Sequence, residues 1–259
     1  MKGFVAPLDP SGRASLYGPP PWHFAGRSIT VLARCDAAGV AALVPLPLRP
    51  WGEPVVRFSV HDLMCDLGHG WGWAQANPAE ACFREAVIGL AVEHSGRIGF
   101  WDPFLWTDSD AELAVGREFY GWPQRLGSIH LTPPHPVLGW RIGDAAVGQV
   151  SRSGRPVLEL SVRLARNGPP DVAQPRFEGF FLERVLPDPV DASRQREVFF
   201  AQMQDVAIAD VRSGSASLDL YAPELAALGT PEPVSGQVQA VSWTKALAQR
   251  LASERLPPP

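Results

Sequence analysis

The residues best suited to chemistry in this sequence lie in the stretch GREFYGWPQRLG, residues 116–127. A helix predicted to begin at a capping box over residues 109–112 runs into this stretch and ends at Gly121. Gln124 and Arg125 follow directly after a tryptophan and a proline. A carboxamide can donate a hydrogen bond to a carbonyl oxygen, and a guanidinium can bind a carboxylate through two parallel hydrogen bonds. The stretch therefore indicates a constrained pair that could hold a small carbonyl compound.

Glu85 is the second candidate for chemistry. It lies in a predicted strand over residues 82–94, where Phe83 and Val87 share its face because side chains alternate along a strand. A carboxylate among apolar residues has a raised pKa and can act as an acid or a base. The alternatives are a glutamate on the solvent face and one paired with an arginine.

Composition limits the class of protein. The chain has 259 residues with 46% hydrophobic content, which predicts one domain over residues 1–259 with a loose lead-in at 1–20. A formal net charge of −4 gives no electrostatic case for a nucleic-acid partner. No apolar run approaches the roughly 18 residues of a membrane span. Three cysteines without a CxxC pair favour reduced thiols in a cytoplasmic protein.

The remaining sequence is dominated by period-two patterns. Strands are predicted at 24–35, 55–63 and 82–94, with a hairpin across Ser95 and Gly96 into 97–107, followed by further strands between 128 and 221 (SIHL, VLGWRI, VGQVS, PVLELSVRLA, FEGFFLERVLP, EVFFAQMQDVAIADV and SASLDLY). A glycine- and tryptophan-rich loop is predicted at 68–78 and a proline-rich surface loop at 167–175. Asp36 should cap a short helix, and a longer amphipathic helix is predicted over 238–256. The fold class is mainly β, largely antiparallel, with peripheral helices.

Four segments together resemble the acetoacetate decarboxylase family. GREFYGWPQRLG is similar to its active-site segment, in which a Gly-Arg-Glu helix end leads to an aromatic-Pro-Lys-Lys-Leu-Gly turn. RSITVLARCDAAGVAALVPLPL, EPVVRF and CFREAVIGL resemble earlier family segments in the same order. The resemblance covers roughly residues 15 to 255. It implies an antiparallel, cone-like β-barrel and a homo-oligomer.

The resemblance assigns roles to three residues on the early strands. Arg27 matches the arginine that binds the substrate carboxylate in the family. Glu85 matches one of the two active-site glutamates, and Ser59 is aligned with the other one.

The same resemblance assigns Trp122, Gln124 and Arg125 to the active-site turn. Trp122 stands where the family has a smaller aromatic residue, and we expect it to form a wall of the pocket. Gln124 occupies the position of the lysine that forms a Schiff base. Arg125 occupies the position of the second lysine, whose charge activates the first one in acetoacetate decarboxylase.

Gln124 is the departure that matters for mechanism. A carboxamide nitrogen is not a nucleophile, because its lone pair is delocalised into the carbonyl group. The chain has only two lysines, Lys2 in the lead-in and Lys245 in the predicted closing helix, which the resemblance places outside the barrel. We therefore expect no decarboxylation through an imine.

In HDLMCDLGH, His61, Cys65 and His69 have i, i+4, i+8 spacing, which on a helix would suggest a metal site. The segment continues a strand into a glycine-rich loop, so helical spacing has no meaning there. We expect no metal and no cofactor, since nucleotide-binding and hydrolase motifs are also missing from the sequence.

Two functions fit these observations. The first is an enzyme acting on a keto acid or other enolisable carbonyl compound by isomerisation, dehydration, aldol cleavage or cyclisation, in secondary metabolism. Arg27 and Arg125 would bind the substrate, Gln124 would donate to its carbonyl oxygen, and Glu85 would move the proton. The second is a non-catalytic protein that binds a small molecule or regulates on the same scaffold.

Overall fold

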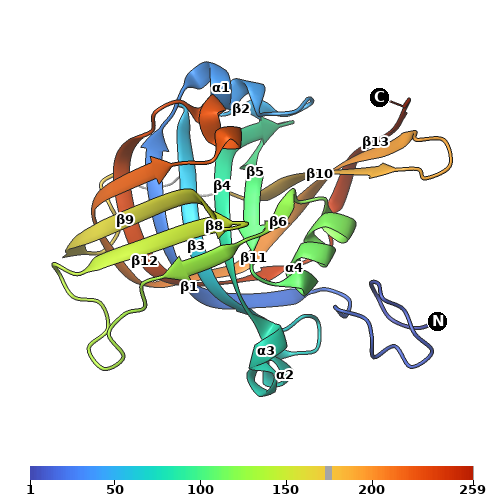
Figure 1. The fold of residues 1–259 in the computed structure, drawn as a ribbon, viewed down its shortest axis with the longest axis horizontal. Coiled ribbons are helices and arrows are strands. Elements are labelled where there is room, and N and C mark those ends of the chain that lie inside the picture. The colour runs from blue at the N-terminus through green and yellow to red at the C-terminus, as the bar shows by residue number, and fades with distance from the viewer. Residues whose placement is uncertain (173–176, 259) are drawn as a thin grey trace.

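The computed structural model describes residues 1–172 and 177–258, and strands dominate it (Figure 1). The strands are β1 (Trp22–Arg34), β2 (Arg49–Pro50), β3 (Val55–Cys65), β4 (Cys82–His94), β5 (Arg97–Thr107), β6 (Gln124–Leu126), β7 (Ser128–Leu131), β8 (Ala145–Arg152), β9 (Arg155–Asn167), β10 (Gly179–Pro187), β11 (Arg194–Leu220), β12 (Glu232–Lys245) and β13 (Gln249–Leu256). The helices are α1 (Ala37–Ala42), α2 (Trp71–Ala76), α3 (Pro78–Ala81), α4 (Asp110–Val115), the π-helical η1 (Gly116–Tyr120) and the 3₁₀-helical η2 (Pro223–Leu228).

Seven strands form a closed ring. Their order is β10-β5-β4-β3-β1-β12-β11, and β11 pairs in turn with β10. Pairing is antiparallel throughout the ring except between β10 and β5. The ring is uneven, because β11 pairs with β10 and β13 at its start, with β12 in its middle and with β9 at its end. The predicted mainly β, antiparallel fold with helices at its periphery is confirmed.

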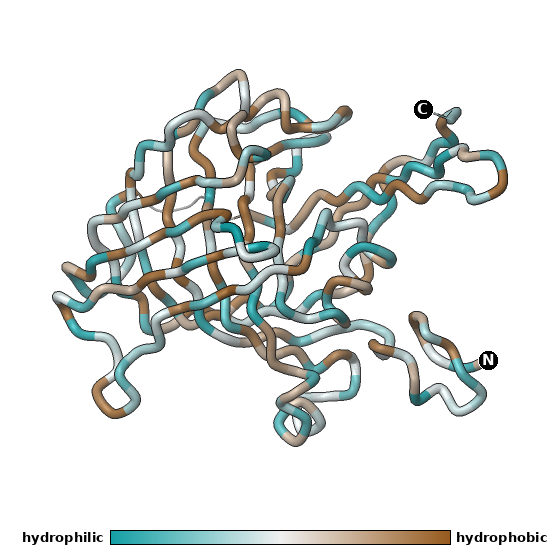
Figure 2. The backbone as a smooth tube through the Cα atoms, in the orientation of Figure 1, coloured by the Kyte–Doolittle hydropathy of each residue, from teal (hydrophilic) through white to brown (hydrophobic). Residues whose placement is uncertain are grey.

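A second layer covers the outer face of the ring. β9, β8 and β7 continue the sheet beyond β11 and lie across β3 and β1 in Figure 1. Val56, Phe58 and Val60 of β3 are fully buried in the same cluster as Leu160 and Val162 of β9. Apolar stretches coincide with the strands of the body in Figure 2. The outer face of β3 is therefore removed from bulk solvent.

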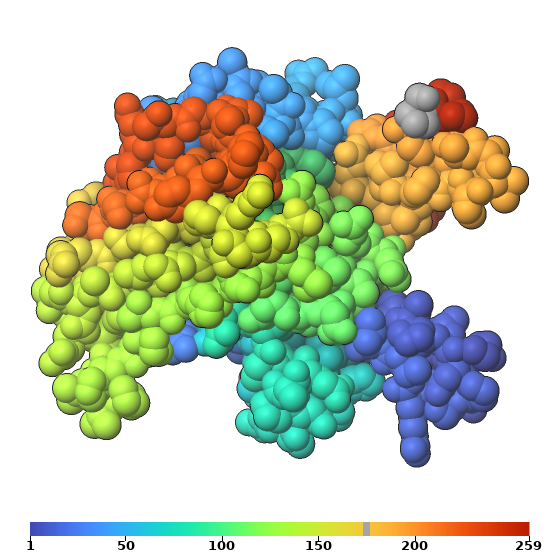
Figure 3. Space-filling view, in the orientation of Figure 1, coloured from blue at the N-terminus to red at the C-terminus, as the bar shows by residue number. Residues whose placement is uncertain are grey.

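Several segments project from this body in Figure 3: the N-terminal lead-in, the α2–α3 pair, the loop between β7 and β8, and an arm made by β10, β13 and the start of β11. The lead-in forms only isolated bridges and bends, as predicted. The expectations of a single domain and of a homo-oligomer stay predictions.

Local signals predicted several elements correctly. The Asp36 carboxylate accepts a hydrogen bond from the Gly39 amide, and Ser109 caps α4 through the Glu112 amide at 3.2 Å. The hairpin between β4 and β5 turns at Ser95 and Gly96. The helix predicted after Ser109 forms as α4 followed by η1, and it ends at Gly121 in the left-handed region (φ 88°).

The predicted closing helix is wrong. Residues 232–245 form β12 and residues 249–256 form β13. β12 pairs with β1 in continuous register from Ile29 opposite Val238 to Trp22 opposite Lys245. Tertiary pairing of this kind overrides local helix propensity.

Two further local predictions are corrected. No strand forms over 137–142, where the structure has turns and one bridge between His135 and Gly139. α2 and α3 occupy the region predicted as a loop. Of the proline-rich stretch at 167–175, residues 173–175 lie outside the described residues.

The contact between α1 and η2 yields a stability prediction. A Cβ at Gly39 would overlap the carbonyl oxygen of Ala227, whereas a Cβ at Gly72 meets nothing within 4 Å. We expect Gly39→Ala to destabilise the protein by about 1–3 kcal/mol through overpacking. Gly72→Ala, on the short helix α2, should be neutral or stabilising by up to about 1 kcal/mol. Urea unfolding of both variants checks this, and equal stabilities would contradict the packing of α1.

Candidate functional site

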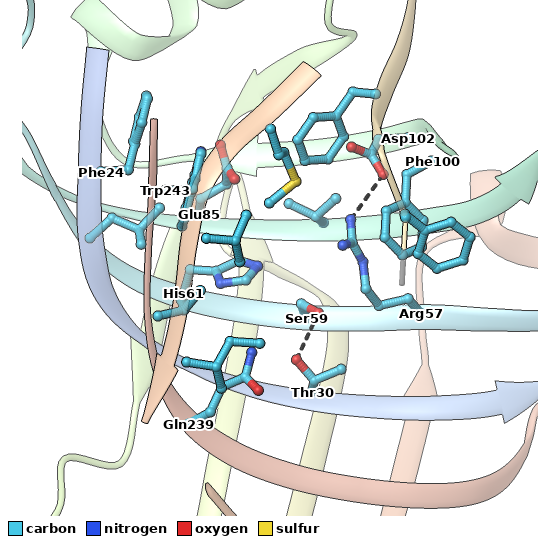
Figure 4. A pocket seen from close by; sticks show the side chains of 18 of the residues that line it. Phe24, Thr30, Arg57, Ser59, His61, Glu85, Phe100, Asp102, Gln239 and Trp243 are labelled. Carbon is cyan, nitrogen blue, oxygen red and sulfur yellow. Dashed lines mark hydrogen bonds and ion pairs between the residues drawn. The ribbon is translucent and has the colours of Figure 1, made fainter. Parts of the chain in front are cut away.

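The ring encloses a cavity of about 580 Å³. Its size lies within the roughly 300–1,000 Å³ of small-molecule sites. Alternate residues of three ring strands point into it, as Figure 4 shows for β3. They are Arg57, Ser59, His61 and Leu63 of β3, Glu85 and Val87 of β4, and Gln237, Gln239, Val241, Trp243 and Lys245 of β12.

Arg57 and Asp102 form a buried ion pair in this cavity. Nη2 of Arg57 lies 3.2 Å from Oδ1 of Asp102, and the guanidinium stacks 3.7 Å from the ring centre of Phe100. Burial raises the pKa of Asp102 to about 6, although the guanidinium opposes this shift. Nε of Arg57 has no hydrogen-bond partner among the described residues. The guanidinium lines the cavity, so its charge lies where an anionic ligand could bind.

Glu85 reaches the same cavity from β4 and is otherwise cut off from solvent. Burial raises the pKa of Glu85 to about 8, and the like charge of Glu112 adds to this effect. The group is therefore mainly a carboxylic acid at neutral pH, and it can exchange a proton with a ligand in either direction.

Two neutral polar groups complete the wall made by β3. Burial, and then the nearby Arg57, lower the pKa of His61 to about 3, so its imidazole is neutral. Nδ1 of His61 has no partner within the part of the chain that the structure describes. Ser59 and Thr30 hydrogen-bond to each other at 2.9 Å, as drawn in Figure 4.

Lys245 lines the cavity at the end of β12, which corrects its predicted position on an outer helix. Its side chain is only 6% exposed. Nζ lies 4.1 Å from the ring centre of Trp122 and 4.5 Å from that of Phe24. Burial lowers the pKa of Lys245, while the carboxyl groups of Glu112 and Glu85 oppose that shift.

Of the five residues predicted for the site, Glu85 and Trp122 line the cavity. Gln124 is completely buried beside it, with Nε2 3.5 Å from the carboxylate of Glu112, itself a lining residue. A Cβ at Gly116 would overlap the amide oxygen of Gln124, so this glycine makes room for the side chain. Among the described residues, that oxygen has no hydrogen-bond partner.

The expected positions of Arg27 and Arg125 are corrected. Arg27 alternates with the lining residues of β1, so it shares a face with the core residue Ile29 and pairs with Asp62 at 2.6 Å. Arg125 pairs with Glu224 at 2.7 Å, outside the cavity. The structure does not bring either guanidinium to the site, and the binding roles predicted for them stay untested.

Sequence reasoning missed most ionisable groups of the cavity, namely Arg57, His61, Asp102, Glu112 and Lys245. A signal was present in VVRFSVHDL, where polar residues alternate with valine and phenylalanine. Such alternation is typical of a strand with one solvated face. Here the polar face turns inward, because the ring closes around it.

The described residues were also compared with the requirements of a membrane-spanning helix and of a metal site. Within residues 1–172 and 177–258, no helix is long and apolar enough to cross a membrane. No group of three or more histidine, cysteine or acidic side chains in those ranges is placed to hold a metal ion.

Comparison with known proteins places this geometry in a family. The model of the family described as Acetoacetate decarboxylase (ADC) matches residues 5–253. An acetoacetate decarboxylase of Streptomyces nogalater is 27% identical over 227 residues, which are 86% of this chain and 81% of that protein. The chain therefore belongs to the acetoacetate decarboxylase family.

Solved structures are similar over almost the whole chain. An acetoacetate decarboxylase-like enzyme from Sphingomonas wittichii RW1 superposes with a TM-score of 0.88 at 27% identity, covering 96% of this chain and 100% of that one. The enduracididine biosynthesis enzyme MppR superposes with TM-scores of 0.87 in complex with pyruvate and 0.86 with the condensation product of pyruvate and imidazole 4-carboxaldehyde. The complex with pyruvate is 26% identical to this chain, and the superposition covers 96% of this chain and 97% of that one. The complex with the condensation product is 27% identical, and the superposition covers 96% of both chains.

The burial of Glu85 predicts a pH-dependent cost of folding. Between its ordinary pKa of 4.5 and about 8, the unfolded chain releases a proton that the folded protein retains. Wild-type stability should therefore fall as pH rises through this window. Glu85→Gln lacks this loss, so its stability relative to wild type should increase from pH 5 to pH 8 and then level off.

Thermal unfolding measures this effect, because each ~1 kcal/mol shifts the Tm by roughly 2–4 °C for a chain of this size. The exposed Glu232, replaced by glutamine, serves as the matched control and should follow the wild-type profile. A parallel pH profile for Glu85→Gln would show that this carboxyl group is solvated.

Proposed function

We propose that this protein is an enzyme that binds a small keto acid, or a similar enolisable carbonyl compound, in the cavity and moves a proton on it. The observation that carries the proposal is the meeting of Glu85, held largely protonated, with the Arg57–Asp102 pair in one enclosed space. A proton donor and a fixed positive charge are the groups that enolisation of a keto acid requires.

Arg57 is proposed to hold the substrate carboxylate. Its guanidinium stays charged at any physiological pH and lines the cavity. Glu85 would then exchange the proton next to the carbonyl carbon. The neutral His61 would donate to the enolate oxygen, and one such donor contributes on the order of 10²–10³ in rate.

The relatives support this substrate class without fixing the reaction. MppR, as named, acts in biosynthesis and has been captured with pyruvate and with a pyruvate condensation product. Enol chemistry in the present cavity would suit isomerisation, dehydration, aldol cleavage or cyclisation in secondary metabolism. The family's imine at the position of Gln124 is outside the proposal, because a carboxamide does not condense with a ketone.

Exchange of the pyruvate methyl protons with deuterated water tests the proposal by NMR. The wild-type protein should accelerate exchange well above the buffer rate. Glu85→Gln should lower kcat by about 10²–10⁴, the usual contribution of a positioned acid or base. Arg57→Met should mainly raise KM, because it removes binding that is uniform along the reaction.

The control is Glu232→Gln, which should exchange pyruvate at the wild-type rate. Pyruvate that binds to the wild-type protein, for example by calorimetry, without any accelerated exchange would contradict the enzyme. That outcome would favour the alternative of a non-catalytic binding protein on this scaffold.

A further inference from the structure

Lys245 occupies a place that a solvated surface lysine would not take. It is the last residue of β12, paired with Trp22 of β1 and Met203 of β11. The strand alternation turns it inward together with Trp243 and Val241. Its ammonium nitrogen lies against three aromatic rings, those of Trp122, Phe24 and Tyr120, at 4.1, 4.5 and 5.1 Å from their centres.

The surroundings of Lys245 do not resemble a structural ion pair. Among the described residues, the one ion pair that joins two lining side chains is that of Arg57 with Asp102. Among the described residues, no carboxylate pairs with Nζ of Lys245. The ionisable groups that face it act from a longer distance: Glu112 of α4, Glu85 of β4, Cys65 of β3 and Asp102 of β5. A buried lysine without a partner is costly to the fold, which favours a chemical reason for it.

We propose that Lys245 is the covalent amine of this site, condensing through Nζ with the carbonyl carbon of the bound keto acid. This inference rests on the proposed function, because it requires a carbonyl compound in the cavity. The proposed amine therefore lies at the end of β12, and not in the turn after Pro123, where this chain has Gln124.

Burial supplies the neutral amine that the reaction needs. Desolvation lowers the pKa of Lys245, so a larger fraction of the group is unprotonated at neutral pH than in water. The aromatic rings and the carboxyl groups favour the charged form, so the group can also return to an ammonium ion. Glu85, with its raised pKa, is the acid present in the same cavity.

The covalent step balances without any oxidant or reductant. The Lys245 nitrogen forms a bond to the carbonyl carbon, and the π electrons of the carbonyl move to oxygen. That oxygen takes up protons from Glu85 and from the attacking nitrogen and leaves as one water molecule, which gives a protonated imine. The Glu85 carboxylate then removes the neighbouring C–H proton, and the C–H electron pair forms an enamine with neutral nitrogen. Reprotonation and addition of water release the keto acid and the amine.

Glu112 connects the two positions in the fold. Its carboxylate accepts hydrogen bonds from Tyr17 and from Gln124, and it is the largest opposing influence on Lys245. The Glu112 carboxylate therefore contacts the buried carboxamide of Gln124 and also acts on the amine of Lys245. Gln124 can position this carboxylate, but it cannot replace the nucleophile.

Borohydride reduction in the presence of pyruvate tests the proposal. Reduction converts the imine to a stable secondary amine, which peptide mass mapping assigns to a residue. The chain has one other lysine, the exposed Lys2, so the assignment is unambiguous. We expect one pyruvate-derived adduct on wild-type protein, located at Lys245, and an unchanged adduct on the matched control Lys2→Arg.

Two variants separate a nucleophile from a charge. Lys245→Arg keeps the positive charge but cannot condense, and Lys245→Met keeps the length and removes the charge. Both should lose the adduct and the accelerated deuterium exchange, while retaining the wild-type circular dichroism spectrum. Retention of exchange by Lys245→Arg would show that only the charge matters and would overturn the proposal.

The remaining outcomes distinguish this inference from the proposed function. Accelerated exchange without any adduct in the wild-type protein, together with exchange in Lys245→Met, would overturn the covalent role and leave the enol chemistry standing. Neither exchange nor adduct in the wild-type protein would contradict the proposed function and the covalent role together. An adduct at Lys2 or at the N-terminal amine alone would exclude Lys245.

Discussion

Burial of β3, under β9 on its outer face and around the cavity on its inner face, is the constraint on which the site depends. The outer face of β3 packs against β9, and its inner face closes around the cavity. A charge on such a strand loses most of its hydration, at a cost of several kcal/mol for each ion unless a partner compensates. Arg57 meets this constraint by pairing with Asp102 and stacking on Phe100. Burial also shifts the pKa values of Glu85, His61, Asp102 and Lys245.

The perturbations have opposite directions for acids and bases, as burial requires. The pKa of Glu85 rises, and the pKa values of Lys245 and His61 fall. A proton donor, a neutral imidazole and an amine with a weakened hold on its proton thus coexist near neutral pH. Environments that separate the pKa values of neighbouring titratable groups in this way are a recurrent property of acid–base sites. Burial lowers the pKa of Arg57 as well, but a guanidinium keeps its charge at physiological pH and can serve as a fixed anchor for an anion.

Much of the fold could be predicted because its signals are local. Period-two alternation predicted the early strands. Asp36 and Ser109 predicted the starts of two helices, and Ser95-Gly96 predicted a hairpin. The helix predicted over 238–256 was wrong. Alanine, glutamine and leucine are good helix formers, whereas the strand pairing that forms instead is with β1, which is remote in sequence. That one error also placed Lys245 outside the site.

The candidate site was predicted in part for a related reason. The resemblance and the alternation agreed on Glu85, and the cavity contains it. For Arg27 the resemblance supplied a role, whereas the alternation around Ile29 turns the side chain toward the outer face. Arg57, Asp102 and Lys245 come from three strands that meet only when the ring closes. Their convergence is a property of the tertiary structure, which no local pattern encodes.

The most direct test of this account is the titration of Glu85 itself. Carbon-13 NMR of protein labelled at the glutamate carboxyl carbons follows each carboxyl group through its pKa, and comparison with Glu85→Gln assigns the relevant signal. We expect this signal to titrate near pH 8, because burial of the carboxyl group disfavours its charged form. Titration near the ordinary value of 4.5 would show that the carboxyl group is well solvated and would contradict the acid role of Glu85.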